Sequence, residues 1–171
     1  MKSIIKDFFT KFGERSYAKS VDADVTQEKY IEPSLLSPLV LAYIGDSVYE
    51  MFVRVTLVSN VDSSVHKLHT EATEYVRCES QADVIRNIYD MLSEKERSIV
   101  KRGRNAHSGY VPKNADVVEY RYATGFESLL GYLYMSREFD RLDYILDLAL
   151  KRVTERKGNE KLTGGRTFTR L

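Results

Sequence analysis

Apolar residues recur at helical spacing along most of this chain, and that periodicity restricts the fold more than any other feature of the sequence. In the clearest stretch, residues three and four positions apart form one stripe that is apolar except for a single serine. The stripe consists of Leu36, Leu39, Val40, Tyr43, Ile44, Ser47, Val48, Met51 and Val55. No pair of segments reads convincingly as two neighbouring strands, so the sequence predicts an all-α bundle.

Capping signals and chain breakers divide this pattern into segments. Ser93 and Glu96 form the sequence signature of a capping box, which opens one of the helices. The expected helices span residues 35–59, 65–78, 80–89, 93–102, 116–135 and 138–153, with a loop at 103–114. We expect three regions, namely an N-terminal arm of uncertain order at 1–33, a helical domain at 34–154 and a basic, disordered tail at 155–171.

The composition is that of one ordinary domain, because 171 residues with 43% hydrophobic residues suffice to bury a core. The net charge is only +1, so contact with nucleic acid requires a local basic patch. Cys78 is the only cysteine, which excludes an intrachain disulfide and fits a reducing compartment. No run approaches the ~18 apolar residues of a membrane span. We therefore expect a soluble cytoplasmic protein that makes no membrane contact.

Two acidic residues stand inside otherwise apolar helical stretches. Asp46 follows Gly45 within residues 41–50, and Glu127 follows Gly125 within residues 125–132. A carboxylate that faces a helical core needs a cation, a donor network or water. Small neighbouring residues would let the two helices approach closely, so the acids could share one Mg²⁺, which accepts one or two carboxylates and keeps several waters. The alternatives are solvated acids, or ion pairs with Arg54 or Arg121.

The densest basic stretch before the tail lies around residue 104, with few acids among its members. The candidate RNA-binding residues are Lys101, Arg102, Arg104, Asn105, Lys113 and Asn114. Such side chains contact phosphates without reading bases. The alternative is a solvated helix end whose basic residues complement the helix dipole.

Several motifs occur together in a recognisable order. They are Tyr43-Ile-Gly-Asp-Ser-Val48, Lys101-Arg-Gly-Arg-Asn-Ala106, Pro112-Lys-Asn114, Tyr120-Arg-Tyr122 and Phe126-Glu-Ser-Leu-Leu-Gly131. The first resembles the signature helix of ribonuclease III domains and the last resembles their second catalytic helix. The intervening motifs are similar to Mini-ribonuclease III, the bacterial group of this family that consists of the nuclease domain alone.

This resemblance implies an all-α ribonuclease III fold that works as a homodimer and hydrolyses double-stranded RNA with Mg²⁺, for which Mn²⁺ can substitute. It implies that Asp46 and Glu127 are the catalytic and metal-binding residues. Members of the group mature both ends of the 23S ribosomal RNA precursor, helped by ribosomal protein L3. We expect the apolar face of the Asp46 helix, including Val48 and Phe52, to form part of the dimer interface, and by analogy Gln81 to face the substrate cleft.

The sequence departs from the larger ribonuclease III enzymes in two ways. Those enzymes carry further acids at the positions of Ala42 and Thr124, so a metal here would have fewer protein ligands and more waters. Glu50 could compensate through water. The double-stranded RNA-binding domain is expected to be missing as well. The competing hypothesis is a catalytically silent RNA-binding or ribosome-assembly scaffold, which the loss of the two acids favours and the retention of Asp46 and Glu127 opposes.

Overall fold

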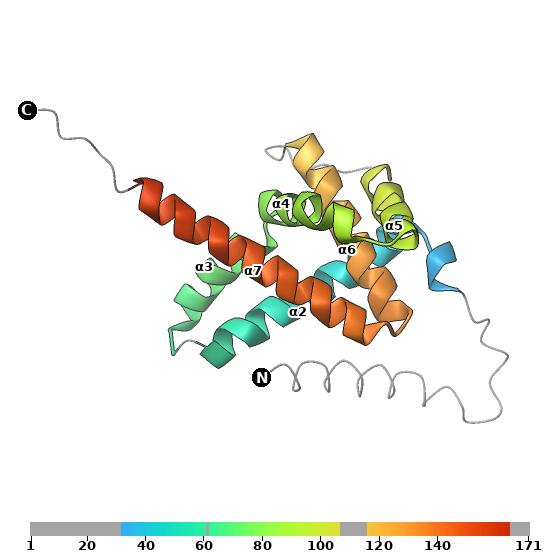
Figure 1. The fold of residues 1–171 in the computed structure, drawn as a ribbon. Coiled ribbons are helices and arrows are strands. Elements are labelled where there is room, and N and C mark those ends of the chain that lie inside the picture. The colour runs from blue at the N-terminus through green and yellow to red at the C-terminus, as the bar shows by residue number, and fades with distance from the viewer. Residues whose placement is uncertain (1–31, 61, 107–115, 165–171) are drawn as a thin grey trace, which may run out of the picture.

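The computed structural model describes residues 32–60, 62–106 and 116–164, and the segments outside these ranges are not discussed further. Within the described residues every regular element is a helix (Figure 1). The elements are η1 (Pro33–Leu35), α2 (Pro38–Asn60), α3 (Val65–Val76), α4 (Cys78–Ile88), η2 (Tyr89–Met91), α5 (Glu94–Arg104), α6 (Val117–Met135) and α7 (Phe139–Gly164). The prediction of an all-α bundle is confirmed for these residues.

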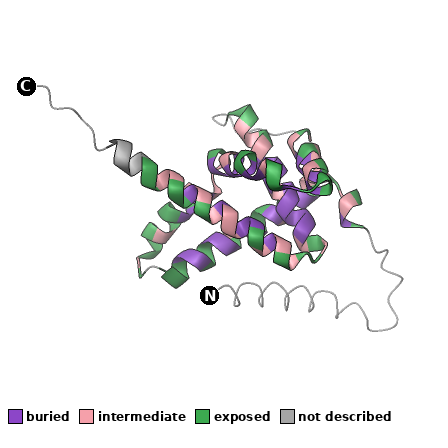
Figure 2. Cartoon of the chain, viewed as in Figure 1, coloured by how far each residue is buried: buried purple, intermediate pink, exposed green. Residues whose placement is uncertain are grey.

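Helix α6 is the central element, because α2, α4, α5 and α7 all pack against it. Its buried residues run from Ala123 to Leu133, with the half-buried Glu127 as the one interruption. Figure 2 shows buried residues along the middle of α2 as well. Tyr49 of α2 and Phe126 of α6 meet edge to face with ring centroids 5.2 Å apart. The absence of a polar side on α6 follows from its central position, since neighbours cover it on several faces.

Local capping explains where two of these helices begin. The Ser93 hydroxyl accepts a hydrogen bond from the backbone of Glu96, and the Glu96 carboxylate accepts one from the backbone of Ser93, which is the predicted capping box. The Asp116 carboxylate accepts from the backbone N–H groups of Val118 and Glu119 at the start of α6. Both boundaries agree with the expectation from sequence.

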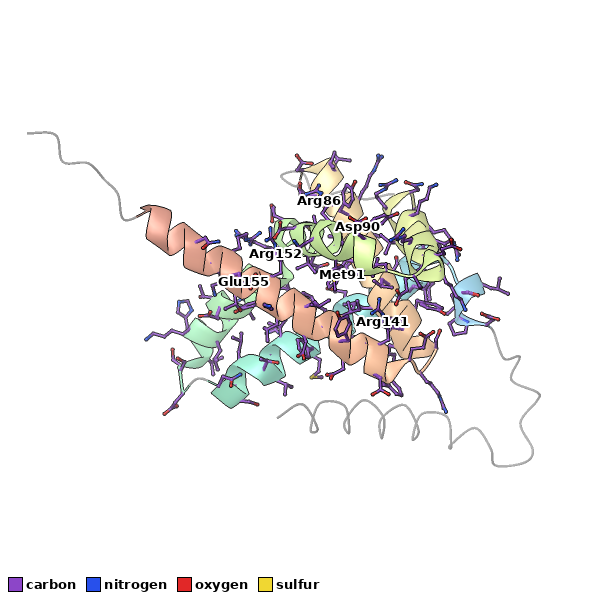
Figure 3. All side chains as sticks on the ribbon, in the orientation of Figure 1. Arg86, Asp90, Met91, Arg141, Arg152 and Glu155 are labelled. Carbon is purple, nitrogen blue, oxygen red and sulfur yellow. The ribbon has the colours of Figure 1, made fainter. Side chains whose placement is uncertain are left out.

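Helix α7 is longer than the sequence predicts. It continues to Gly164, so the prediction of a disordered tail beginning at residue 155 is wrong for residues 155–164. Tertiary contacts supply the missing stabilisation: Arg156 donates to the hydroxyl of Ser80 at 2.6 Å, and Lys157 pairs with Glu71. Nearer its start, Arg141 and Arg152 join α7 to Glu96 and Asp83 (Figure 3).

The exposed face of α2 differs from the one expected. Val48 and Phe52 are only 5% and 3% exposed, because they pack into the core of the chain itself, and they cannot form the surface of a partner interface. The apolar residues that α2 does expose are Val40, Tyr43, Met51, Val55 and Val58, which we call the α2 stripe. The expectation that Val48 and Phe52 lie at a partner interface is therefore wrong, and a dimer interface on α2 stays a prediction.

Candidate active site

Helices α2 and α6 touch backbone to backbone where they cross. A Cβ atom at Gly45 would lie 1.8 Å from the carbonyl oxygen of Glu127, and one at Gly131 would lie 1.9 Å from the carbonyl oxygen of Leu41. Neither separation is possible for real atoms, so both positions require glycine. Because Asp46 follows Gly45 directly, this crossing brings Asp46 and Glu127 to one place although 81 positions separate them in the sequence.

Both carboxyl groups have raised pKa values. Burial, with a further contribution from the charge of Asp46, raises the pKa of Glu127 from 4.5 to about 8. Asp46 lies at the more exposed end of the pair, and partial desolvation together with Glu50 raises its pKa above the ordinary 3.8. Two acids that are both disfavoured as anions form a site that a cation would relieve.

Two residues at the start of α4 share this site. Burial raises the pKa of the Cys78 thiol, and the nearby charges of Glu127, Glu79 and Asp46 add to the rise. Gln81 is 2% exposed, and its nearness to Glu127 lowers the pKa of that carboxyl against the larger effect of burial. The hypothesis that Gln81 faces the site agrees with this geometry. The sequence did not predict that Cys78 lies near the two acids, because its neighbours in the sequence do not distinguish a cysteine at a functional site from one that only packs in the core.

The donor set fits a hard divalent ion that keeps most of its water. Ala42 and Thr124 are both 6% exposed, and the Thr124 hydroxyl donates to the carbonyl of Tyr120 within its own helix, so neither adds a ligand. Among residues 32–60, 62–106 and 116–164, no cluster of three His, Cys, Asp or Glu side chains is placed to hold a metal. Two carboxylates with several retained waters is an arrangement suited to Mg²⁺.

The proposed ion pair between Asp46 and Arg54 is not formed. Arg54 instead pairs with Glu50 at 3.1 Å, one turn further along α2. Glu50 is therefore already partnered, which weakens the suggestion that it supplements the metal ligands through water. Surface pairs of this kind contribute little to stability, so the Glu50 carboxylate could still change partner.

The basic residues near position 104 have different environments. They end α5 rather than forming a loop, and α5 meets α6 at Gly103, where an added Cβ would approach both Gly125 and Ser128. This contact holds the basic end of α5 against the segment of α6 that carries Glu127. Lys101 is exposed and available to a phosphate.

Arg102 is the exception, because its guanidinium is already bound within the chain, and its contact with RNA stays a prediction. Its guanidinium donates to the carbonyl oxygens of Ser34 at 2.5 Å and Leu36 at 2.9 Å, which ties the segment before α2 to α5. A group used in this way has few donors left for a phosphate.

Arg104 stacks on the Tyr122 ring with its guanidinium carbon 5.4 Å from the ring centroid, and it also contacts Asn105. Asn105 itself is exposed. Lys113 and Asn114 lie outside the described residues.

Comparison with known proteins points to the same part of the chain, namely the crossing of α2 and α6. The Ribonuclease III domain model matches residues 39–138, which include both helices of the crossing. The chain belongs to the ribonuclease III family. Mini-ribonuclease 3 of Thermoanaerobacter sp. (strain X514) is 51% identical over 120 residues, which are 70% of this chain and 84% of that protein. Mini-ribonuclease 3 of Enterococcus faecalis (strain ATCC 700802 / V583) is 44% identical over 128 residues, covering 74% and 96%.

A solved structure supports the ribonuclease III fold of this chain. A crystal structure of a protein from Fusobacterium nucleatum superposes with a TM-score of 0.63 at 25% identity, covering 68% of this chain and 93% of that one. Membership of the ribonuclease III family makes the chain an endoribonuclease with a role in RNA processing. None of the helices described here is both long and apolar enough to cross a membrane.

Proposed function

We propose that this chain is a Mg²⁺-dependent endoribonuclease that cleaves double-stranded RNA at the site formed by Asp46 and Glu127. The observation that carries the proposal is the crossing of α2 and α6, which joins two acids whose pKa values are both raised and which therefore favours a cation between them. Mn²⁺, which also accepts oxygen ligands, would substitute for Mg²⁺.

In the proposed reaction, the two acids bind the metal ion and the metal ion activates the water. Asp46 and Glu127 would hold the ion, and a bound Mg²⁺ supplies an activated water and stabilises charge on the scissile phosphate. Hydrolysis then leaves a 5′-phosphate and a 3′-hydroxyl. The loss of the proton that Glu127 holds near neutral pH accompanies metal binding, since only the carboxylate is a good ligand.

A homodimer would provide one such site for each strand of a duplex. The α2 stripe supports this proposal, because Tyr43 is 75% and Val58 is 65% exposed on the same helix that carries Asp46. Several large apolar side chains along one exposed helix face are typical of a protein interface. A twofold axis beside the stripe would bury it against its own copy and hold two sites on one assembly.

Lys101, together with Arg104 and Asn105, would contact the RNA backbone. A-form RNA is recognised through phosphates and 2′-hydroxyls, which an exposed lysine at a helix end can reach. We further propose that the substrate is the 23S ribosomal RNA precursor, matured at both ends in the cytoplasm, with ribosomal protein L3 as a candidate partner. The relatives named Mini-ribonuclease 3 support this choice.

One assay tests the central proposal. Wild-type protein, Asp46→Asn and Glu127→Gln are incubated with a perfect RNA duplex in Mg²⁺ or in EDTA, and products are resolved on a denaturing gel. We expect cleavage only by the wild type and only with the metal. Cleavage in EDTA, or by both variants, would contradict the assignment of these residues.

The alternative function is a catalytically silent scaffold that binds RNA or ribosomal proteins. It is favoured by Ala42 and Thr124, which are buried where the larger enzymes carry acids. The same assay separates the two functions, because a scaffold binds the duplex in a gel-shift experiment and leaves both strands intact in every buffer.

A further inference from the structure

The junction between α3 and α4 is held by two neighbouring side chains. Helix α3 ends at Val76, Arg77 adopts an extended backbone (φ −64°, ψ 150°), and α4 starts at Cys78. The Ser80 hydroxyl donates to the carbonyl oxygen of Glu74 at 2.6 Å, and Nε2 of Gln81 donates to the carbonyl oxygen of Val76 at 2.8 Å. Both side chains thus satisfy carbonyls at the end of α3, which a helix terminus leaves without partners.

Gln81 differs from Ser80 because its side chain also reaches the neighbourhood of Glu127. Its amide lies near enough to Glu127 to lower the pKa of that carboxyl against the effect of burial. Its Oε1 atom is buried and has no hydrogen-bond partner, although the whole side chain is only 2% exposed. Buried carbonyl oxygens are seldom left unpaired, because the lost hydration is not replaced. An unpaired acceptor fixed next to the carboxylate pair indicates that a donor belongs there.

We infer that Gln81 is a positioning residue of the metal site. Its Nε2 group holds the Glu127 carboxyl in place, and its Oε1 atom accepts a hydrogen bond from a water that the bound ion carries. This inference rests on the proposed metal-binding function of Asp46 and Glu127. Such a residue would also compensate for the missing carboxylates at Ala42 and Thr124, because a metal site with few protein ligands depends more on the groups that orient its waters.

The network beside Gln81 anchors the first turn of α4. Ser80 accepts hydrogen bonds from Arg156 of α7 at 2.6 Å and from Arg77 at 3.3 Å while it donates to Glu74. The first turn of α4 is therefore tied to α3 and α7 at once. The Gln81 amide itself is held by its own hydrogen bond to Val76, and a positioning residue needs such a bond because an amide that could rotate freely would not orient anything.

Binding of Mn²⁺ to the full-length chain tests the inference independently of catalysis. The free Mn²⁺ signal is followed by electron paramagnetic resonance for the wild type, Asp46→Asn, Gln81→Met and Ser80→Ala. Met has nearly the volume of Gln and neither donor nor acceptor. Ser80→Ala is the matched control, because it removes the neighbouring hydrogen bond to α3 and leaves the contact with Glu127. Gln81→Asn, which keeps the amide and draws it back by one methylene, serves if Gln81→Met does not fold.

We expect Asp46→Asn to abolish binding, Gln81→Met to weaken it roughly tenfold, and Ser80→Ala to leave it within about twofold of the wild type while lowering the melting temperature. With an RNA duplex, Gln81→Met should lower kcat and leave KM unchanged. Unchanged Mn²⁺ affinity in Gln81→Met, or an equal loss in Ser80→Ala, would overturn the inference and leave the proposed function standing. Absence of Asp46-dependent binding in the wild type would overturn both. Weaker binding by Gln81→Met in a protein that does not cleave RNA would sustain the inference and remove the proposed function.

Discussion

Replacing Glu127 with Gln should abolish cleavage and at the same time stabilise the metal-free protein at neutral and alkaline pH. The native state holds the proton of Glu127 up to a pKa of about 8, whereas the unfolded chain releases it near 4.5. Between these values the native state binds more protons than the unfolded state, so the free energy of unfolding falls as the pH rises. Gln has no proton to lose and avoids this penalty.

The size of the effect follows from the same two values. A rise in pKa from 4.5 to about 8, at about 1.4 kcal/mol per pH unit, sets an upper limit of about 5 kcal/mol. Glu127 is not completely buried and water screens it in part, so we expect about 2 kcal/mol at pH 8. With a urea m-value of roughly 2 kcal/mol/M, the unfolding midpoint of Glu127→Gln should exceed that of the wild type by about 1 M.

Urea unfolding in EDTA at pH 5, 6.5 and 8, at one fixed protein concentration, provides the measurement. The difference between the two proteins should be smallest at pH 5 and grow up to pH 8. Asp62→Asn, an exposed acid before α3, controls for the loss of one negative charge. The reasoning is refuted if the difference does not change with pH, or if Glu127→Gln is the less stable protein at pH 8.

Further predictions concern the crossing, the basic helix end and the interface. Gly45→Ala should destabilise the protein by at least about 3 kcal/mol in urea unfolding, because its Cβ would meet the α6 backbone, whereas Gly158→Ala, with nothing within 4 Å, should be neutral or slightly stabilising. A large loss in both would point to a general intolerance of alanine. Lys101→Ala should flatten the slope of log affinity for duplex RNA against log salt by about 1. Arg102→Ala should leave that slope unchanged and cost about 2 kcal/mol of stability through its two carbonyl contacts. Met51→Glu should convert a dimer into a monomer in light scattering, and a dimer that persists would exclude the α2 stripe as the interface.

Helical periodicity predicted the bundle and most helix boundaries, because local spacing and caps decide them. The capping box at Ser93 and the start of α6 at Asp116 could be read directly from residue types. The end of α7 could not, since residues 155–164 carry many charges and glycines and are held by contacts with Ser80 and Glu71 from distant segments. Tertiary contacts of this kind leave no trace in local composition.

The candidate site was predictable in its acids and not in its surroundings. Asp46 and Glu127 stand out because each interrupts an apolar stretch beside glycine. The carbonyl contacts of Arg102 were not foreseen, because a basic residue that caps backbone carbonyls and one that binds phosphate have the same sequence signal. Val48 and Phe52 were wrongly expected at a partner surface, since a helix that is apolar on several sides does not reveal which side the core takes.

Main-chain contact at Gly45 and Gly131 means that the gap between the two acids is not adjustable by repacking side chains. Changing the size of neighbouring residues would shift both carboxylates together or unfold the crossing. Altered ion preference must therefore be engineered by adding oxygen donors at a fixed spacing. Ala42 and Thr124, which lie one turn before Asp46 and Glu127 on the two crossing helices, are the positions to choose for a new carboxylate.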